Sequence, residues 1–348
     1  MAVENTVSHL SPTRFAQEYA TLKHQVKDAG LLERQPLYYM FKFVILLLLL
    51  SVSISLCFLL KPFGFQLLNA AFLAIITTQL GLLGHSAGHR QIFQSTRKND
   101  IVGLIAGNLL VGLDIEWWIE RHNKHHSNPN QHDVDPDVYI PIIAFAPEDL
   151  EGKSKILLSL MRYQAYFFFP MLSLALIDMH INSIRYMFKS QLRYAFAERS
   201  LLLLHFALYF GVLFYCFPIW QAIIFMVVHH ILSGVYQGSI FAPNHKGMPV
   251  LEKDCKMDFM HRQVLTARNI HAHPVTDFWY GGLNYQIEHH LFPSMAQNKL
   301  REAQFIVRIF CQEHGISYYE TNLWQSYHET LASLHEVTAP LRHANVLF

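Results

Sequence analysis

Four long apolar runs dominate the hydrophobic pattern of the chain, and they come in two pairs. The runs are 43–60, 62–84, 201–217 and 219–242. A bilayer core about 30 Å thick needs on the order of 20 residues of helix, so each run is long enough to cross it. Only Lys61-Pro62 separates the first pair and only Pro218 separates the second. The pattern therefore predicts two transmembrane helical hairpins.

Two weaker apolar runs are expected to lie at the membrane surface. The run 101–113 is too short to cross a bilayer and is followed by Asp114-Ile-Glu116-Trp117-Trp118, which predicts a half-buried or interfacial helix. The run 163–177 is rich in aromatic residues and contains Pro170, so we interpret it as a second interfacial helix.

The chain after residue 296 is polar with a helical pattern, in which a few apolar side chains form the expected buried stripe. These are Leu300, Phe305, Ile306 and Ile309. Basic residues precede the first long run and follow the second, which predicts that both ends of that hairpin are cytoplasmic. We expect both chain termini on this side as well.

These elements predict an all-α integral membrane protein with four transmembrane helices in two hairpins, interfacial helices and a cytoplasmic helical cap. The predicted segments are a cytoplasmic N-terminal segment (1–38), a membrane domain (39–295) and a cytoplasmic C-terminal helical segment (296–348). The chain is 52% hydrophobic and only 15% charged, which is too apolar for an ordinary soluble domain. A net charge of +1 gives no reason to expect a nucleic-acid partner.

Histidine clusters stand at the edges of the apolar runs. They are His85-Ser-Ala-Gly-His89, His122-Asn-Lys-His125-His126 and Gln286-Ile-Glu-His289-His290. Imidazole is the commonest protein ligand for transition metals. In the predicted topology the three clusters and His245 all fall on the cytoplasmic side. The candidate metal ligands are His85, His89, His122, His125, His126, His245, His289 and His290.

The spacing within the clusters favours more than one metal ion. His85 and His89 are four residues apart and share one face of a helix. Adjacent histidines such as His125 and His126 point about 100° apart and can serve different ions. A single tetrahedral zinc cannot use eight ligands.

The ligand chemistry favours redox iron, with copper and zinc left open. No glutamate is followed three residues later by histidine, so the chain lacks the pair typical of carboxylate-rich di-iron bundles. The four cysteines form no C-x-x-C pair, which argues against a thiolate metal site or a disulfide framework. His229 and His230 lie inside the fourth run, about four turns before His245, and we do not expect them to bind metal.

Together these motifs resemble those of the membrane fatty-acid desaturases. The resemblance includes the three clusters, Trp117-Trp118, Asp135-Pro136-Asp137, Thr266-Ala-Arg-Asn269-Ile and the stretch 281–293. It is greatest for the branch of linoleoyl-CoA and front-end (acyl-lipid delta-6-like) desaturases, in which the third cluster opens with glutamine, as Gln286 does here.

The resemblance implies two histidine-bound irons, O2 as co-substrate and a cis double bond made in an acyl-CoA or acyl-lipid. It also implies that His245 is a ligand outside the three clusters, and that Asn269 or Gln286 holds a metal-bound water or orients a ligand. Trp117 and Trp118 are interpreted as interfacial anchors or as substrate-tunnel residues.

The chain contains no flavin, haem or iron-sulfur motif, including the His-Pro-Gly-Gly motif of fused cytochrome b5 domains. We therefore expect electrons from a separate ferredoxin or from cytochrome b5 with its reductase. A bacterial inner membrane is favoured over an endoplasmic reticulum or plastid membrane.

Two alternatives stay open at this point. One is a related membrane di-iron oxygenase, such as a hydroxylase, acetylenase or ketolase, with the same ligands. The other is a membrane metal-ion transporter, which would need ionisable residues along its membrane-spanning stretches rather than clusters at one end.

Overall fold

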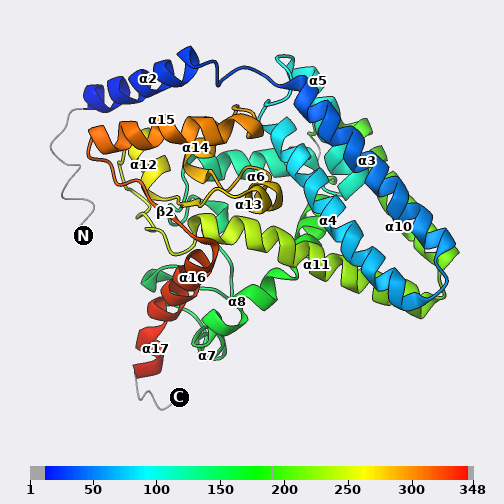
Figure 1. The fold of residues 1–348 in the computed structure, drawn as a ribbon. Helices are drawn as coiled ribbons and strands as arrows, with labels where there is room; N and C mark the ends of the chain where they lie inside the picture. The colour runs from blue at the N-terminus through cyan, green and yellow to red at the C-terminus, as the bar shows by residue number, and fades with distance from the viewer. Residues whose placement is uncertain (1–11, 190, 344–348) are drawn as a thin grey trace. The chain divides into compact units, whose positions relative to one another are not determined.

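The computed structural model describes residues 12–189 and 191–343, and these residues are almost entirely helical (Figure 1). In this part of the chain the single sheet is a parallel pairing of β1 (Asn269–Ile270) with β2 (Glu320–Thr321). The expected all-α class is confirmed. The predicted terminal segments extend outside the described residues, into 1–11 and 344–348.

Each of the four long apolar runs forms a helix that is long and apolar enough to cross a membrane. These helices are α3 (Pro36–Leu59), α4 (Phe63–Gly88), α10 (Ala195–Cys216) and α11 (Ile219–His245). They confirm the predicted number of candidate spans and fit a multi-pass membrane protein. Two further helix pairs are sharply bent, and counting each as one span would raise the number to six.

The chain divides into two compact units, which are described separately. The first unit contains the described residues up to 33, residues 122–168 and the described residues from 240 onward. The second unit contains residues 34–121 and 169–239.

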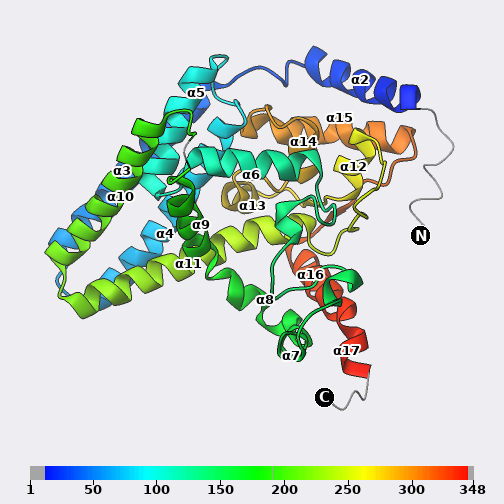
Figure 2. The ribbon, with the colours of Figure 1, turned by 180° about the vertical axis from the view of Figure 1, so that it is seen from behind.

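In the second unit α3 packs along α4 and also contacts α10, and both ribbon views show these helices side by side (Figures 1 and 2). A polar contact joins the first two helices: Ser53 Oγ donates to Asn69 Oδ1 at 2.8 Å, and Asn69 Nδ2 donates to the Ser53 carbonyl at 3.0 Å. Such pairing satisfies polar groups that lipid cannot.

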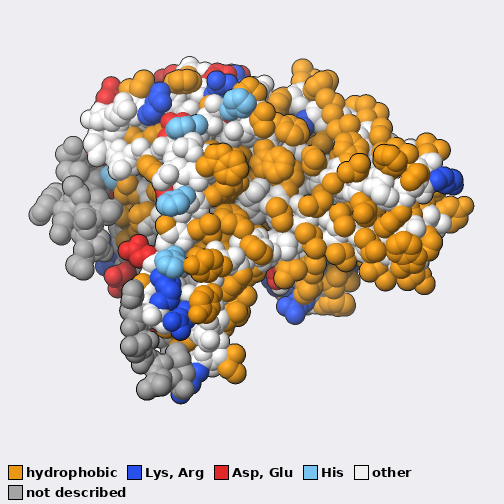
Figure 3. Space-filling model, turned by 60° about the horizontal axis from the view of Figure 1, so that its bottom comes forward, with side chains coloured by type: hydrophobic (Ala, Val, Ile, Leu, Met, Phe, Trp, Pro, Cys, Tyr) orange, Lys and Arg blue, Asp and Glu red, His pale blue; other side chains and the backbone are white. Residues whose placement is uncertain are grey.

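The surface of the second unit is apolar. Figure 3 shows hydrophobic side chains gathered over the helices of this unit. They include Leu37, Phe41, Leu48, Leu59, Leu68, Leu208, Tyr215 and Ile219, all of them well exposed. Because a water-soluble domain rarely exposes so large an apolar area, this surface is suited to lipid.

The short run at 101–113 folds as α5 (Thr96–Gly103) followed by a π-helix, η1 (Leu104–Val111). η1 contacts both α4 and α10, and it ends at Gly112, whose φ is +81°. A Cβ at Gly112 would lie 2.5 Å from the His205 ring, so both the left-handed backbone and the close approach require glycine. The helix α6 (Ile115–Ser127) then starts at a bend of 109°.

The run at 163–177, expected as one helix, forms two: α8 (Gln164–Leu172) and α9 (Ala175–Tyr186), bent by 63°. At the break, both the backbone N–H and the Oγ of Ser173 donate to the Pro170 carbonyl, at 3.2 and 2.6 Å. The serine hydroxyl therefore competes for the helix carbonyl and ends α8.

Two glycines let α11 approach the end of α8 closely. A Cβ on Gly234 would lie 2.4 Å from the Ser173 carbonyl oxygen, and a Cβ on Gly238 would meet Leu172 at 2.6 Å. Gly234 and Gly238 have the small-xxx-small spacing that lets helix backbones pack in membranes.

We expect Gly234→Ala to destabilise the protein by about 1–3 kcal/mol, because the helices must move apart. The matched control is Gly211→Ala in α10, where a Cβ would meet nothing within 4 Å. Thermal unfolding of the two variants in the same detergent should separate them. Equal midpoints would show that the close approach is not needed.

The core of the first unit includes buried residues of α2 (Pro12–Asp28) and α15 (Leu300–Glu313), which run side by side in Figure 1. The buried face of α15 consists of Leu300, Ala303, Gln304, Val307, Phe310 and Cys311. The predicted stripe was therefore wrong at Phe305 and Ile309, which are each 52% exposed. The 3.6-residue period starting at Leu300 leaves those two positions outside the buried face.

The remaining elements all belong to the first unit. They are η2 (Pro136–Val138), η3 (Pro147–Leu150), α7 (Lys155–Met161), α12 (Phe259–Leu265), α13 (Pro274–Tyr280), α14 (Gln286–Leu291), η4 (Gln297–Lys299), α16 (Leu323–Val337) and α17 (Ala339–His343). α12 packs on α14, which contains the third histidine cluster.

Candidate metal centre

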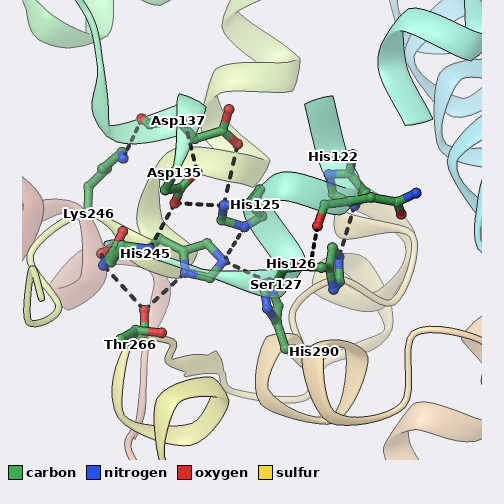
Figure 4. A network of polar contacts seen from close by, with 12 residues as sticks. His122, His125, His126, Ser127, Asp135, Asp137, His245, Lys246, Thr266 and His290 are labelled. Atoms are coloured by element: carbon green, nitrogen blue, oxygen red, sulfur yellow. Dashed lines mark hydrogen bonds and ion pairs between the residues drawn. The ribbon is translucent and has the colours of Figure 1, made fainter. Parts of the chain in front are cut away.

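Three histidines from distant parts of the sequence meet inside the first unit. His125 lies in α6, His245 is the last residue of α11, and His290 lies in α14. The Nε2 atom of His245 lies 3.3 Å from Nε2 of His125 and 3.1 Å from Nε2 of His290. All three rings are buried, and Figure 4 shows them facing one another.

The other nitrogen of each ring fixes its tautomer. Nδ1 of His125 lies 2.9 Å from Oδ2 of Asp135, Nδ1 of His245 lies 3.0 Å from the Thr266 carbonyl, and Nδ1 of His290 lies 2.8 Å from Oε1 of Gln263. Carbonyl and carboxylate oxygens only accept, so each Nδ1 bears a hydrogen, and in the neutral ring each Nε2 then presents a lone pair.

Three lone pairs facing one another inside a protein favour a cation between them. A metal–nitrogen bond of about 2.1 Å places two ligand nitrogens about 3.0 Å apart at a right angle and about 3.4 Å apart at a tetrahedral angle. The observed separations of 3.1 and 3.3 Å lie between these values. The donor set therefore fits a transition-metal ion, for which neutral imidazole is a suitable ligand.

Asp135 holds the second cluster in place. Its Oδ2 accepts from His125 and, at 2.8 Å, from the Asn130 N–H, while its Oδ1 accepts from the Asp137 N–H at 2.9 Å. Burial opposes ionisation of this carboxyl, but His125 outweighs it and holds the pKa of Asp135 well below its usual range. A carboxylate–histidine pair of this kind orients a metal-binding ring.

His122, His126 and His289 form a neighbouring group in the same unit. Nε2 of His122 lies 3.0 Å from Nε2 of His126, one turn further along α6. The ring of His289 lies 4.8 Å from that of His126, and the His126 and His290 rings stack at 4.2 Å. The second and third clusters are therefore brought together, as the sequence predicts for a shared centre.

His85 and His89 lie in the second unit, at the end of α4, with ring centroids 4.7 Å apart. Trp118 packs against both rings, at 5.0 and 6.0 Å. This places Trp118 beside candidate ligands, whereas Trp117 contributes its backbone N–H to Asp114 Oδ1 at 2.9 Å. A Cβ on Gly88 would strike the Trp118 ring at 2.7 Å, so the tryptophan fits only against glycine.

The two candidates for water binding or ligand orientation have different surroundings. Gln286 lies in the centre: its Nε2 is 2.9 Å from Nε2 of His245, and its Oε1 accepts from Asn244 at 2.8 Å. The Asn269 side chain is directed to α14 instead. It donates to Glu288 Oε2 at 2.6 Å and accepts from the Ile287 N–H at 2.9 Å.

Glu288 is buried between the third cluster and the C-terminal part of the chain. Tyr318 donates to its Oε1 at 2.8 Å, and burial raises the pKa of Glu288 to about 7. Asn269, Tyr318 and Glu288 together fix the position of α14, from which His289 and His290 project.

Sequence reasoning missed Gln263 and Asn130. Gln263 accepts from His290 and donates to the His126 carbonyl at 2.9 Å, so it links the second and third clusters. Asn130 donates to the His245 carbonyl at 2.9 Å. Neither residue belongs to a motif, and only the contacts identify them.

Comparison with known proteins agrees with this chemistry. A family model described as fatty acid desaturase matches residues 62–322. The chain is 31% identical to an acyl-lipid (9-3)-desaturase of Physcomitrium patens over 95% of its own length, and it spans 65% of the length of that relative. It is 29% identical to a Delta(6)-fatty-acid desaturase of Caenorhabditis elegans, and the match covers 94% of this chain and 76% of the relative. It is 28% identical to a Delta(8)-fatty-acid desaturase of Euglena gracilis, and that match covers 87% of this chain and 74% of the relative.

Proposed function

Because the chain belongs to the fatty acid desaturase family, we propose that it uses O2 to introduce a cis double bond into a fatty-acyl chain. The observation that supports this most directly is the convergence of His125, His245 and His290, with three Nε2 lone pairs at metal-ligand spacing. The acyl carrier is a CoA thioester or a lipid, and the named relatives include acyl-lipid and Delta(6), Delta(5) and Delta(8) desaturases.

The proposed cofactor is a pair of iron ions held by histidine nitrogen alone. The proposed ligands are His85, His89, His122, His125, His126, His245, His289 and His290. Bound iron would supply the oxidising power needed to remove hydrogen from an unactivated methylene. Gln286, beside His245, is proposed to orient this ligand or hold a water.

The chain's own residues position and isolate the centre. Asp135, Thr266 and Gln263 each accept a hydrogen from one imidazole Nδ1, so the opposite nitrogen is directed inward. The rings of His125, His245, His289 and His290 are buried, so bulk water is kept away from the reacting acyl chain.

The proposal includes the setting of the enzyme. The four candidate spans are proposed to form two hairpins that place both termini and the metal centre on the cytoplasmic side of the membrane. A separate ferredoxin or cytochrome b5 with its reductase is proposed to supply the electrons. The bacterial inner membrane stays the predicted location.

The experiment that tests the function is expression in a host fed defined fatty acids, followed by mass spectrometry of its lipids. We expect new unsaturated acyl chains that are absent from the vector control. An unchanged lipid profile, despite a full iron content and a competent reductant, would contradict the proposal.

We expect Asp135→Asn to reduce iron content or activity by about 10- to 100-fold, because an amide nitrogen at Oδ2 cannot accept from His125. Metal analysis of the purified protein and lipid analysis of the same cells provide the two measurements. The control is Asp133→Asn, whose side chain is half exposed and pairs with Lys253. Equal losses in both variants would show that the His125 contact is unimportant.

A further inference from the structure

A cavity of about 220 Å³ lies inside the second unit. Residues of α3, α4, η1, α9, α10 and α11 line it, and most of them are aliphatic or aromatic. Four histidines also line it, none of them from the three clusters: His180, His205, His229 and His230. The His180 ring lies 6.2 Å from that of His205 and 5.4 Å from that of His230.

Three of these histidines, His205, His229 and His230, lie within candidate spans, and His180 lies in α9. His205 lies four residues after the start of the apolar run 201–217, and His229 lies ten residues after the start of the run 219–242. Ten residues of helix rise about 15 Å, which is half of a bilayer core of about 30 Å. Polar side chains at this depth are costly, and where they occur they commonly mark a functional site.

In three of these histidine rings, one nitrogen makes a hydrogen bond to a backbone carbonyl. His180 Nε2 lies 3.0 Å from the Val111 carbonyl, His205 Nδ1 lies 2.9 Å from the Leu109 carbonyl, and His230 Nδ1 lies 2.8 Å from the Met226 carbonyl. A carbonyl only accepts, so these nitrogens bear the ring hydrogen. A neutral imidazole has one such hydrogen, which leaves Nδ1 of His180 and Nε2 of His205 and His230 as acceptors.

His229 differs because both of its nitrogens have partners. Nδ1 lies 2.8 Å from the Tyr209 hydroxyl and Nε2 lies 3.2 Å from Thr77 Oγ1. Thr77 Oγ1 donates its hydrogen to the Leu73 carbonyl at 3.0 Å, so it accepts a hydrogen bond from Nε2 of His229. Nδ1 of His229 therefore has no hydrogen and accepts from the Tyr209 hydroxyl. The lining therefore combines an apolar wall with imidazole nitrogens that accept, and the complementary ligand is an apolar molecule with a hydrogen-bond donor.

We propose that this cavity binds a lipid-soluble molecule through a hydroxyl group that donates to the acceptor nitrogen of His230, with His180 and His205 as further lining of the same cavity. The hydroxyl can belong to a long-chain alcohol or to an alkyl hydroquinone, and the two share this chemistry. The proposal goes beyond desaturation and does not require an active metal centre.

The test is equilibrium binding of tritiated dodecan-1-ol to the full chain in phosphatidylcholine nanodiscs, with empty nanodiscs as the background. We expect saturable binding that unlabelled dodecan-1-ol or a decyl hydroquinone displaces, and the stronger competitor identifies the source of the hydroxyl. Dodecyl methyl ether, which has no donor, should compete about three- to tenfold more weakly than dodecan-1-ol. Unsaturable binding, or equal competition by the ether, would overturn the proposal.

His230 supplies the matched variants, because its Nδ1 bonds a carbonyl within its own helix, so this bond does not join two elements. His230→Leu should weaken binding of dodecan-1-ol by about three- to tenfold, whereas His230→Gln, which keeps an acceptor, should stay within about twofold of the parent. The same loss for both variants, or no loss for either, would contradict a hydrogen bond to this ring.

Discussion

Replacing His245 with alanine is expected to abolish the new acyl unsaturation, with a loss of at least about 100-fold. The Nε2 atom of His245 lies within 3.3 Å of those of both His125 and His290, so it is the central donor of the three. Without it, two rings from different elements are left to hold the ion. Loss of even an outer partner of a ligand costs about 10- to 100-fold, and loss of the ligand itself should cost more.

The matched control is His24→Ala, because His24 is a well-exposed histidine of α2 that lies beside Asp28 at the surface. Iron per protein chain, elution volume in detergent and lipid composition should be measured for both variants. His24→Ala should match the parent in all three. A His245→Ala protein that keeps its iron and its product would show that the three-histidine group is not the centre of the activity.

Arg268→Leu is expected to lower the free energy of unfolding by about 3 kcal/mol or more. The Arg268 side chain is fully buried, donates to the carbonyls of Pro243 and Lys246 at the end of α11, and pairs with Glu329 of α16. A leucine would remove the arginine donor from the Pro243 carbonyl and from Glu329 Oε2, although Thr330 would still donate to the Lys246 carbonyl. Breaking a buried pair commonly costs about 3–5 kcal/mol.

Thermal unfolding should show the effect of Arg268→Leu as a fall in midpoint on the order of 4–7 °C. The control is Arg308→Leu in α15, whose side chain is 40% exposed and lies 3.7 Å from Glu320. An exposed pair of this kind contributes about 0–1 kcal/mol. If the two variants have the same unfolding midpoint, the buried arginine does not stabilise the end of α11.

The long spans could be predicted from sequence because a bilayer imposes one requirement, about 20 apolar residues in a row, and the four runs meet it. The α15 stripe was harder, since Phe305 and Ile309 are apolar yet exposed, and hydrophobicity alone does not tell which face of a helix is covered. The break between α8 and α9 depends on the Ser173 hydroxyl, a single local bond that periodicity does not reveal.

The histidine clusters were visible because their members are neighbours in sequence. Their partners were less visible: Gln263 and Thr266 contact histidines of other elements, and the Thr266 contact uses a backbone carbonyl, which any residue type provides. Asp135 was an intermediate case, since Asp135-Pro136-Asp137 was among the motifs of the resemblance, and only the 2.9 Å contact shows that Asp135 accepts from His125.

The inward-facing lone pairs of His125, His245 and His290 also bear on the lifetime of the protein in a cell. One ion would cross-link stretches of chain separated by 120 and 45 positions, which stabilises the folded form by mass action. During iron starvation the three stretches would lose that cross-link, and the facing lone pairs would repel one another. The chain would then unfold locally more often, and proteases would cleave it faster. The iron supply would thus set the amount of the protein in the cell as well as the fraction of it that is active.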